Sequence, residues 1–194
     1  MPADSAPLPC SMPQLPARVT LRNGQQILLR QIRDDDKAGV LDAFELLSDD
    51  SRYTRFMAMV KDLPEALLDH VVHPQPGREC TLVAVANPDQ TGELVGGASY
   101  TAIAGRDACE FAVTLLDGWH AQGLARVLMQ TLIEAARAAG FHLMEGYVLA
   151  SNTAMRGLSH RLGFTDTICA DDATLRVVTL ELNPARTAVA GSTA

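Results

Sequence analysis

Residues 117–126, DGWHAQGLAR, are the part of this sequence whose residue types and spacing point most directly to chemistry. They follow a strand-like run and open a helix, so free backbone N–H groups and the positive end of the helix dipole meet there. Such a terminus binds phosphate oxygens. Gly123 and Ala125 leave room for a pyrophosphate, and Arg126 can add positive charge. A glycine at a helix start also serves simple packing, so this segment alone leaves both interpretations open.

The common phosphate motifs do not occur around this segment. The sequence contains neither the nucleotide-binding pattern GxxxxGK[ST] nor the dinucleotide fingerprint GxGxxG. A nucleotide is therefore disfavoured as the ligand of this helix start.

Glu110 is the second residue with chemical potential. It stands in an otherwise apolar strand-like run, residues 108–116. A carboxylate in such a run is costly unless it is paired or used, so Glu110 is either a catalytic base or a salt-bridged strand residue. The sequence does not decide between the two.

The pattern of apolar residues predicts the elements that position these groups. We expect a hairpin around Asn23-Gly24 and helices at residues 36–47, 48–59 and 64–72, followed by a β-meander. Residues 121–139 and 152–162 have helical spacing, and the remaining runs read as strands: 80–86, 94–104, 108–116, 142–149, 165–169 and 175–182. The fold class is α/β (α+β), with a mixed, mostly antiparallel sheet of six to seven strands flanked by about four to five helices.

We expect one domain at residues 18–182, after a disordered proline-rich lead at 1–17 and before a flexible tail at 183–194. The lead lacks the basic and apolar regions of a signal peptide, and no apolar run reaches the roughly 18 residues that a membrane span needs. A cytoplasmic protein without a membrane partner is the expectation. The net charge of -7 argues against nucleic acid as a partner and suits a cationic acceptor.

No metal site is expected. The four cysteines form no CxxC pair and no cluster with histidine, and three of them fall in strand-like segments as buried free thiols. Three adjacent carboxylates, Asp34, Asp35 and Asp36, stand on one turn and cannot converge easily on one ion. We interpret them as capping and first-turn residues of the following helix.

The spaced motifs resemble the GNAT acetyltransferase superfamily. The matching residues are EFAV at 110–113, WHAQGLA at 119–125, NTAM at 152–155 and RLGF at 161–164. The segment LSDDSRYTRF at 47–56 further resembles the start of the acetyltransferase domain of bacterial protein-lysine acetyltransferases. The resemblance extends from about residue 25 to residue 182, and it implies the GNAT fold. It also implies transfer of an acetyl group from acetyl-CoA to a primary amine, of a protein lysine or a small molecule, by direct attack in a ternary complex.

The resemblance assigns roles to individual positions. The strand end would pair with the pantetheine arm, the helix start would bind the pyrophosphate, and Asn152 would meet the pantetheine or the amine. Glu110 would be the base that accepts the proton of the amine, and a backbone N–H near Leu115 would meet the oxyanion. The implied cofactor contacts are Val113, Thr114, Leu115, Gln122, Gly123, Leu124, Ala125, Arg126 and Asn152.

Two positions depart from the family pattern. His120 replaces the usual glutamine or arginine of the phosphate loop, and Ser159 replaces the tyrosine that often serves as general acid. Water, His160 or the departing ammonium would then protonate the thiolate, since Tyr100 and Tyr147 have no motif support. A non-catalytic acyl-CoA-binding regulatory module is therefore the alternative. Whether a partner subunit, as in a homodimer, completes the site is left open.

Overall fold

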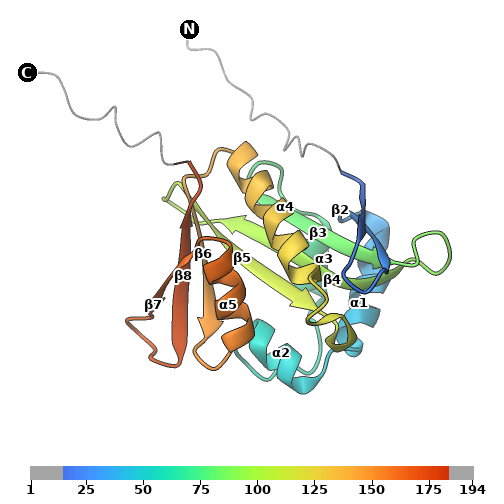
Figure 1. Ribbon diagram of the computed structural model, residues 1–194, viewed down its shortest axis with the longest axis horizontal. Helices are drawn as coiled ribbons and strands as arrows, with labels where there is room; N and C mark the ends of the chain where they lie inside the picture. Colours follow the sequence, from blue (N-terminus) through green and yellow to red (C-terminus); the bar gives the residue numbers. More distant parts are fainter. Residues whose placement is uncertain (1–14, 184–194) are drawn as a thin grey trace, which may run out of the picture.

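A computed structural model describes residues 15–183 of the protein (Figure 1). Its strands are β1 Ala17–Thr20, β2 Gln26–Gln31, β3 Glu79–Ala86, β4 Glu93–Ala102, β5 Ala108–Leu115, β6 Leu143–Leu149, β7 Thr165–Ile168 and β8 Leu175–Glu181. Its α-helices are α1 Lys37–Glu45, α2 Asp49–Phe56, α3 Glu65–Val72, α4 Leu124–Ala138 and α5 Thr153–Arg161. The predicted sequence of elements is confirmed.

All strands join one sheet in the order β1-β2-β3-β4-β5-β6-β8-β7. Only β5 and β6 run parallel, and the other neighbours are antiparallel. The mixed, mostly antiparallel sheet is confirmed, but its eight strands exceed the predicted six to seven. The count is higher because the first hairpin and the β7–β8 pair each extend the same sheet at its two ends.

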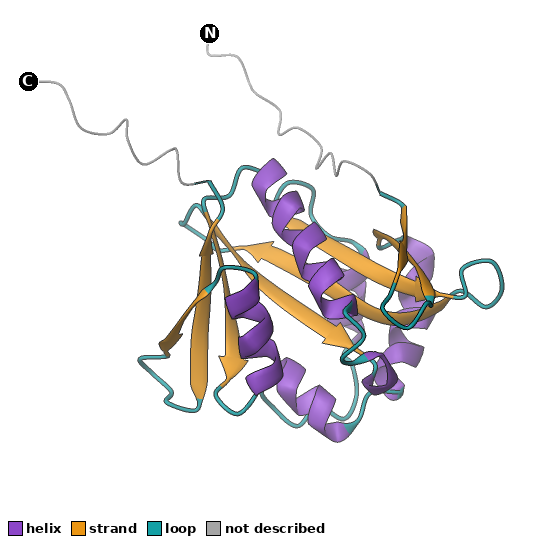
Figure 2. Cartoon of the chain, viewed as in Figure 1, coloured by secondary structure: helices purple, strands orange, loops and turns teal. Residues whose placement is uncertain are grey.

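Helices cover both faces of the sheet (Figure 2). Helices α4 and α5 pack on one face over the larger core cluster, where Leu124, Leu128 and Leu132 are fully buried. Helices α1, α2 and α3 cover the other face (Figure 1). No helix within residues 15–183 is long and apolar enough to cross a membrane.

In the acidic triplet, Asp36 caps a turn and pairs with Arg30. Asp34–Asp36 form a 3-10 turn, and the buried Asp36 carboxylate accepts hydrogen bonds from Arg30 at 2.6 and 2.7 Å and from the backbone N–H of Arg33 at 2.8 Å. Within the described part of the chain, no group of three or more His, Cys, Asp or Glu side chains could hold a metal ion.

The first strand and the last described residue lie near the two predicted domain boundaries, residues 18 and 182. Strand β1 begins at Ala17, one residue before the expected boundary, and Asn183 donates a hydrogen bond to the carbonyl of Phe141. Most of the expected lead and tail, residues 1–14 and 184–194, lies outside the described residues.

Candidate active site

Strands β5 and β6 separate after three paired residues. Their parallel register runs from Ala108 opposite Leu143 to Glu110 opposite Glu145 and then ends, although both strands continue. On its other side, β5 stays paired with β4 as far as Leu115. The sheet therefore opens between β5 and β6 on the carboxyl side of Glu110. Figure 1 shows the two strands diverging.

Backbone groups of β5 face this opening at alternate residues. The carbonyl of Asp107 accepts from β6-side N–H groups, and the N–H of Leu116 donates to Val95 of β4. Because N–H and C=O groups alternate sides along a strand, those of Val113 and Leu115 point toward β6 where β6 has moved away. Those of Thr114 point toward β4. The opening thus presents an unpaired strand edge to a ligand.

The start of α4 is arranged for an anion. Its N-cap residue is Gly123, with φ 93° and no side-chain capping hydrogen bond. The N–H groups of Leu124, Ala125 and Arg126 have no acceptor within the helix, since the first intrahelical bond is made by the next residue. By contrast, Ser48 caps α2 and Asn152 caps α5 through their side chains. The positive φ at Gly123, together with φ 60° at Ala121, delays the helix from the predicted residue 121 to 124.

Neighbouring segments hold the loop before α4 in place. Gln122 donates to the carbonyl of Gly118 at 2.7 Å and accepts from Asn23 of the β1–β2 turn at 2.6 Å. Ser51 of α2 donates to Asp117 at 2.5 Å, and this bond is the main cause of the lowered pKa of Asp117. The loop is therefore fixed from both ends by side chains distant in sequence.

A cleft of about 880 Å³ joins the strand opening to the start of α4. Eight of the predicted site residues line it: Glu110, Val113, Thr114, Leu115, Gly123, Ala125, Arg126 and Asn152. Two do not. Gln122 is held on the loop, and the Leu124 side chain is buried in the core, so each can offer a ligand only its backbone.

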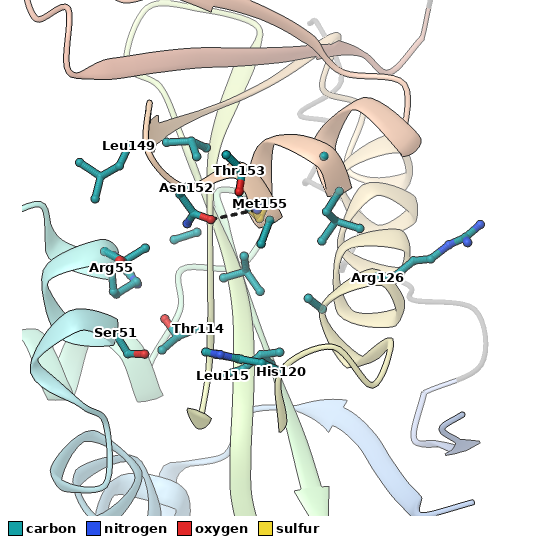
Figure 3. A pocket seen from close by; sticks show the side chains of 18 of the residues that line it. Ser51, Arg55, Thr114, Leu115, His120, Arg126, Leu149, Asn152, Thr153 and Met155 are labelled. Carbon is teal, nitrogen blue, oxygen red and sulfur yellow. Dashed lines mark hydrogen bonds between the residues drawn. The ribbon is translucent and has the colours of Figure 1, made fainter. Parts of the chain in front are cut away.

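The close view separates the walls of the cleft (Figure 3). Ser51 and Arg55 reach in from α2, and Asn152, Thr153 and Met155 lie at the start of α5 on another wall. Arg126 projects from α4 away from the other labelled side chains. Arg22 lies nearer the loop, since a Cβ atom built on Gly123 would be 3.9 Å from its Nε.

Glu110 lies where the two strands part, on the face of the sheet opposite α4. Its side chain is accessible from the cleft. Desolvation raises its pKa, the charge of Glu145 raises it further, and the charge of Arg55 acts in the opposite direction. Glu145 is itself buried and held by two hydrogen bonds from Arg106, at 2.9 and 2.7 Å. No ion pair within hydrogen-bonding distance joins Glu110 to a basic side chain among residues 15–183, although the charge of Arg55 acts on it.

The side chain of Asn152 has a local task that the motif did not reveal. Its Oδ1 accepts from the backbone N–H of Met155 at 2.9 Å, which caps α5 (Figure 3). Its amide nitrogen makes no hydrogen bond within the described residues and remains available to the cleft.

The residues considered as proton donors differ in whether they line the cleft. Ser159 is 1% exposed, outside the cleft lining, and its Oγ has no hydrogen-bond partner in the described chain. His160 is exposed and also outside the lining. Tyr147, which no motif supported, does line the cleft and follows Glu145 by two residues on β6. His120 lines the cleft as well.

The motif residues around Phe111 maintain the strand opening. The Phe111 ring packs edge to face on Phe164, with ring centroids 5.3 Å apart. A Cβ atom on Gly146 of β6 would lie 2.5 to 2.9 Å from the Phe111 ring. Glycine at 146 therefore lets this ring occupy the space beside the diverging strands.

Sequence reasoning assigned no role to three arginines that line the cleft, Arg22, Arg55 and Arg161. Arg22 comes from the turn after β1, and Arg55 comes from the last turn of α2. Arg22 is far in sequence from the motif residues, so spacing carried no signal for it, and Arg161 belongs to the RLGF motif, which gave it no role. Arg55 falls within the segment 47–56 that carried the family resemblance, but that resemblance assigned it no role.

Comparisons with known proteins agree with this geometry. The sequence profile described as the acetyltransferase (GNAT) family matches residues 40–164. Acetyltransferase PA5475 of Pseudomonas aeruginosa is 34% identical over 155 residues, covering 80% of this chain and 83% of that protein. The L-methionine sulfoximine/L-methionine sulfone acetyltransferase of the same species is 41% identical over 80 residues, which are 39% of this chain and 46% of that protein.

Solved structures show the same fold. The GNAT domain of S. lividans PAT has a TM-score of 0.77 at 24% identity, covering 85% of this chain and 96% of that one. The acetyltransferase yncA from Salmonella typhimurium, solved with acetyl-CoA, has a TM-score of 0.64 at 23% identity, covering 85% and 99%. The family profile spans more than half of this sequence, and PA5475 aligns over most of both chains. This chain therefore belongs to the GNAT family of acetyltransferases.

Proposed function

We propose that the enzyme moves the acetyl group of acetyl-CoA to a primary amine in one ternary complex, with Glu110 as the base. The observation that most supports this proposal is that Glu110 and the uncapped start of α4 line one continuous cleft. They lie at the two ends of the unpaired edge of β5. The free N–H groups at residues 124–126 suit the pyrophosphate, and the open backbone of Val113 and Leu115 suits the pantetheine amides. Arg22 adds positive charge beside the pyrophosphate.

For this reaction the protein must position the amine next to the thioester and transfer protons. An alkylammonium has a pKa of about 10.4, so a base must remove a proton before the nitrogen can attack. The raised pKa of Glu110 makes it a stronger base than a fully solvated glutamate. The C–N bond then forms at the thioester carbon, and the C–S bond breaks. A backbone N–H at the end of β5 stabilises the oxyanion.

The leaving thiolate needs a proton, and Tyr147 is our candidate donor. Desolvation and the charges of Glu145 and Glu110 raise the pKa of its phenol, which stays protonated at neutral pH. Ser159, at the family's tyrosine position, is buried and does not reach the cleft. The proton given up by the amine nitrogen ultimately balances the one gained by sulfur.

A covalent acetyl-cysteine route is unfavourable. Cys109 is the cysteine next to the base, but it is fully buried, and burial raises the pKa of its thiol to about 12. The thiolate needed for attack is therefore scarce at neutral pH. This supports direct attack by the amine.

The acceptor is a protein lysine or a small amine. The L-methionine sulfoximine/L-methionine sulfone acetyltransferase acts, by its name, on small amino-acid derivatives, which gives the small-amine option a related precedent. Release of the CoA thiol, measured with amines and lysine peptides, tests the proposal. Acceptor-dependent release with an acetylated product supports it. Tight binding of acetyl-CoA without release from any acceptor would instead favour the regulatory module.

A further inference from the structure

A second cavity opens beside the catalytic cleft, on the face of the sheet covered by α1, α2 and α3. It has a volume of about 290 Å³ and shares Arg55, Ala112, Thr114 and Leu115 with the cleft. We call it the side chamber. The side chamber lies on the same face of the sheet as Glu110. It is therefore next to the place where the acceptor amine would bind.

The side chamber has a floor of small residues and an apolar roof. The floor includes Gly97 and Ser99 of β4, paired across the sheet with Thr114 and Ala112 of β5. The roof is built from large apolar side chains of α1, α2, α3 and the loops between them: Phe44, Leu47, Phe56, Leu63 and Leu67. None of the described residues that line it is acidic, and its single charged one is Arg55.

Arg55 stands at the junction of the two cavities and has no hydrogen-bonded or ionic partner among residues 15–183. It is partly shielded from water, yet no described residue gives it a hydrogen bond or an ion pair, and its guanidinium lies 5.0 Å from the Phe56 ring centroid. Every other described arginine that is shielded to this degree is bonded: Arg30, Arg52, Arg156 and Arg176. Burial lowers the pKa of Arg55, and only the charge of Glu110 opposes this.

The guanidinium of Arg55 lines the cleft without a hydrogen bond to any described residue, so it is available to an anionic group of a ligand. Arginine binds carboxylates through two parallel hydrogen bonds. Arg55 and Glu110 lie on different walls of the cleft, and no ion pair joins them although they interact electrostatically. A cation and a carboxylate on two walls of one cleft can bind the carboxylate and the ammonium group of a free amino acid.

We propose that the acceptor is an α-amino acid with an uncharged, apolar side chain. Arg55 binds its carboxylate, the side chamber takes its side chain, and Glu110 faces its α-amine. The nitrogen forms its bond to the acetyl carbon as the C–S bond breaks, and the products are the N-acetylamino acid and CoA thiol. This inference rests on the function proposed above and names its substrate class.

The direct test compares acceptors that differ in one group. L-leucine, L-leucinamide, a lysine peptide blocked at its α-amine, and spermidine are supplied with saturating acetyl-CoA, and kcat/KM is measured from thiol release. Loss of one charge-assisted pair is worth about 10- to 100-fold, so leucine is expected to exceed leucinamide by that factor. Leucine is also expected to exceed the lysine peptide and spermidine, because the side chamber offers their charges only a cation.

The variant Arg55→Gln removes the guanidinium at similar length and is expected to bring the leucine-to-leucinamide ratio close to one. Arg55→Lys keeps the charge without the fork and should retain part of the ratio. Binding of acetyl-CoA, measured by calorimetry, verifies that both variants are folded. Ser99→Leu narrows the side chamber alone and is expected to raise the KM for leucine relative to glycine.

The outcomes separate this inference from the proposed function. If the wild-type enzyme acetylates leucinamide, spermidine or the lysine peptide better than leucine, the amino-acid inference is overturned and amine acetylation stands. An unchanged ratio in Arg55→Gln, or an unchanged leucine preference in Ser99→Leu, also overturns it. If no acceptor yields an acetylated product, the proposed function itself fails.

Discussion

Replacing Gly123 by alanine should separate the backbone strain of the loop before α4 from its role in binding. Gly123 has φ 93°, and a Cβ atom there meets only Arg22, at 3.9 Å. A left-handed alanine costs about 1–2 kcal/mol, and the stiffer unfolded chain offsets about 0.4–1 kcal/mol of that. The free energy of unfolding should therefore fall by about 1 kcal/mol, which lowers the Tm by about 2–4 °C.

The effect on binding should be larger than this strain. The added methyl stands at the free N–H groups of the helix start, where the pyrophosphate must approach closely. Loss of one hydrogen bond to a charged group costs about 1.5–3 kcal/mol, so the Kd for acetyl-CoA should rise about 10- to 100-fold. Gly123→Glu, which adds a negative charge, should abolish binding.

Gly140→Ala is the matched control. Gly140 has φ 88° and follows the other end of α4, and a Cβ atom there meets nothing within 4 Å. It should lose similar stability in a thermal melt and keep the wild-type Kd in calorimetry. If Gly123→Ala and Gly123→Glu both bind acetyl-CoA as tightly as Gly140→Ala, the pyrophosphate does not lie at this helix start.

Three further changes test the other parts of the account. Glu110→Gln should lower kcat strongly with an unchanged Kd for acetyl-CoA. The base must be ionised, and the pKa of Glu110 is raised. Wild-type activity should therefore fall on acidification at a higher pH than it would with a solvated glutamate, whose pKa is about 4.3. A wild-type kcat in Glu110→Gln would show that Glu110 is not the base. Tyr147→Phe should slow turnover at constant acetyl-CoA affinity, whereas Ser159→Ala, which deletes a buried unbonded Oγ, should change neither rate nor affinity; the reverse pattern would make Ser159 the acid. Gly146→Ala forces a Cβ atom against the Phe111 ring and should destabilise the fold by about 1–3 kcal/mol in denaturant titration, and an unaffected midpoint would show that the ring moves freely.

The sequence was most informative where the physics is local. The Asn23-Gly24 turn, the apolar stripe of α4 and the glycine at the start of α4 each follow from neighbouring residues, and all are confirmed. What depended on tertiary packing was not accessible. Arg22 and Arg55 reach the cleft only because the hairpin and α2 fold beside it.

The motif resemblance predicted which residues lie near the site better than it predicted what their side chains do there. The amide of Asn152 is partly used to cap its own helix, and the hydroxyl of Ser159 is turned into the core. A motif records that a residue type recurs at a position, but the hydrogen bonds that its side chain makes depend on the packing around it. Tyr147 shows the converse, because its place beside the cleft comes from strand alternation on β6 and not from any motif.

Hydrogen exchange at the edge of β5 is the most direct measurement of whether acetyl-CoA binds in the opening between β5 and β6. The amides of Val113 and Leu115 face that opening, and the amide of Thr114 is already directed at β4. With saturating acetyl-CoA, the first two should become strongly protected and the third should change little. If Val113 and Leu115 exchange as fast with the ligand as without it, the pantetheine arm does not pair with this strand and the proposed site is wrong.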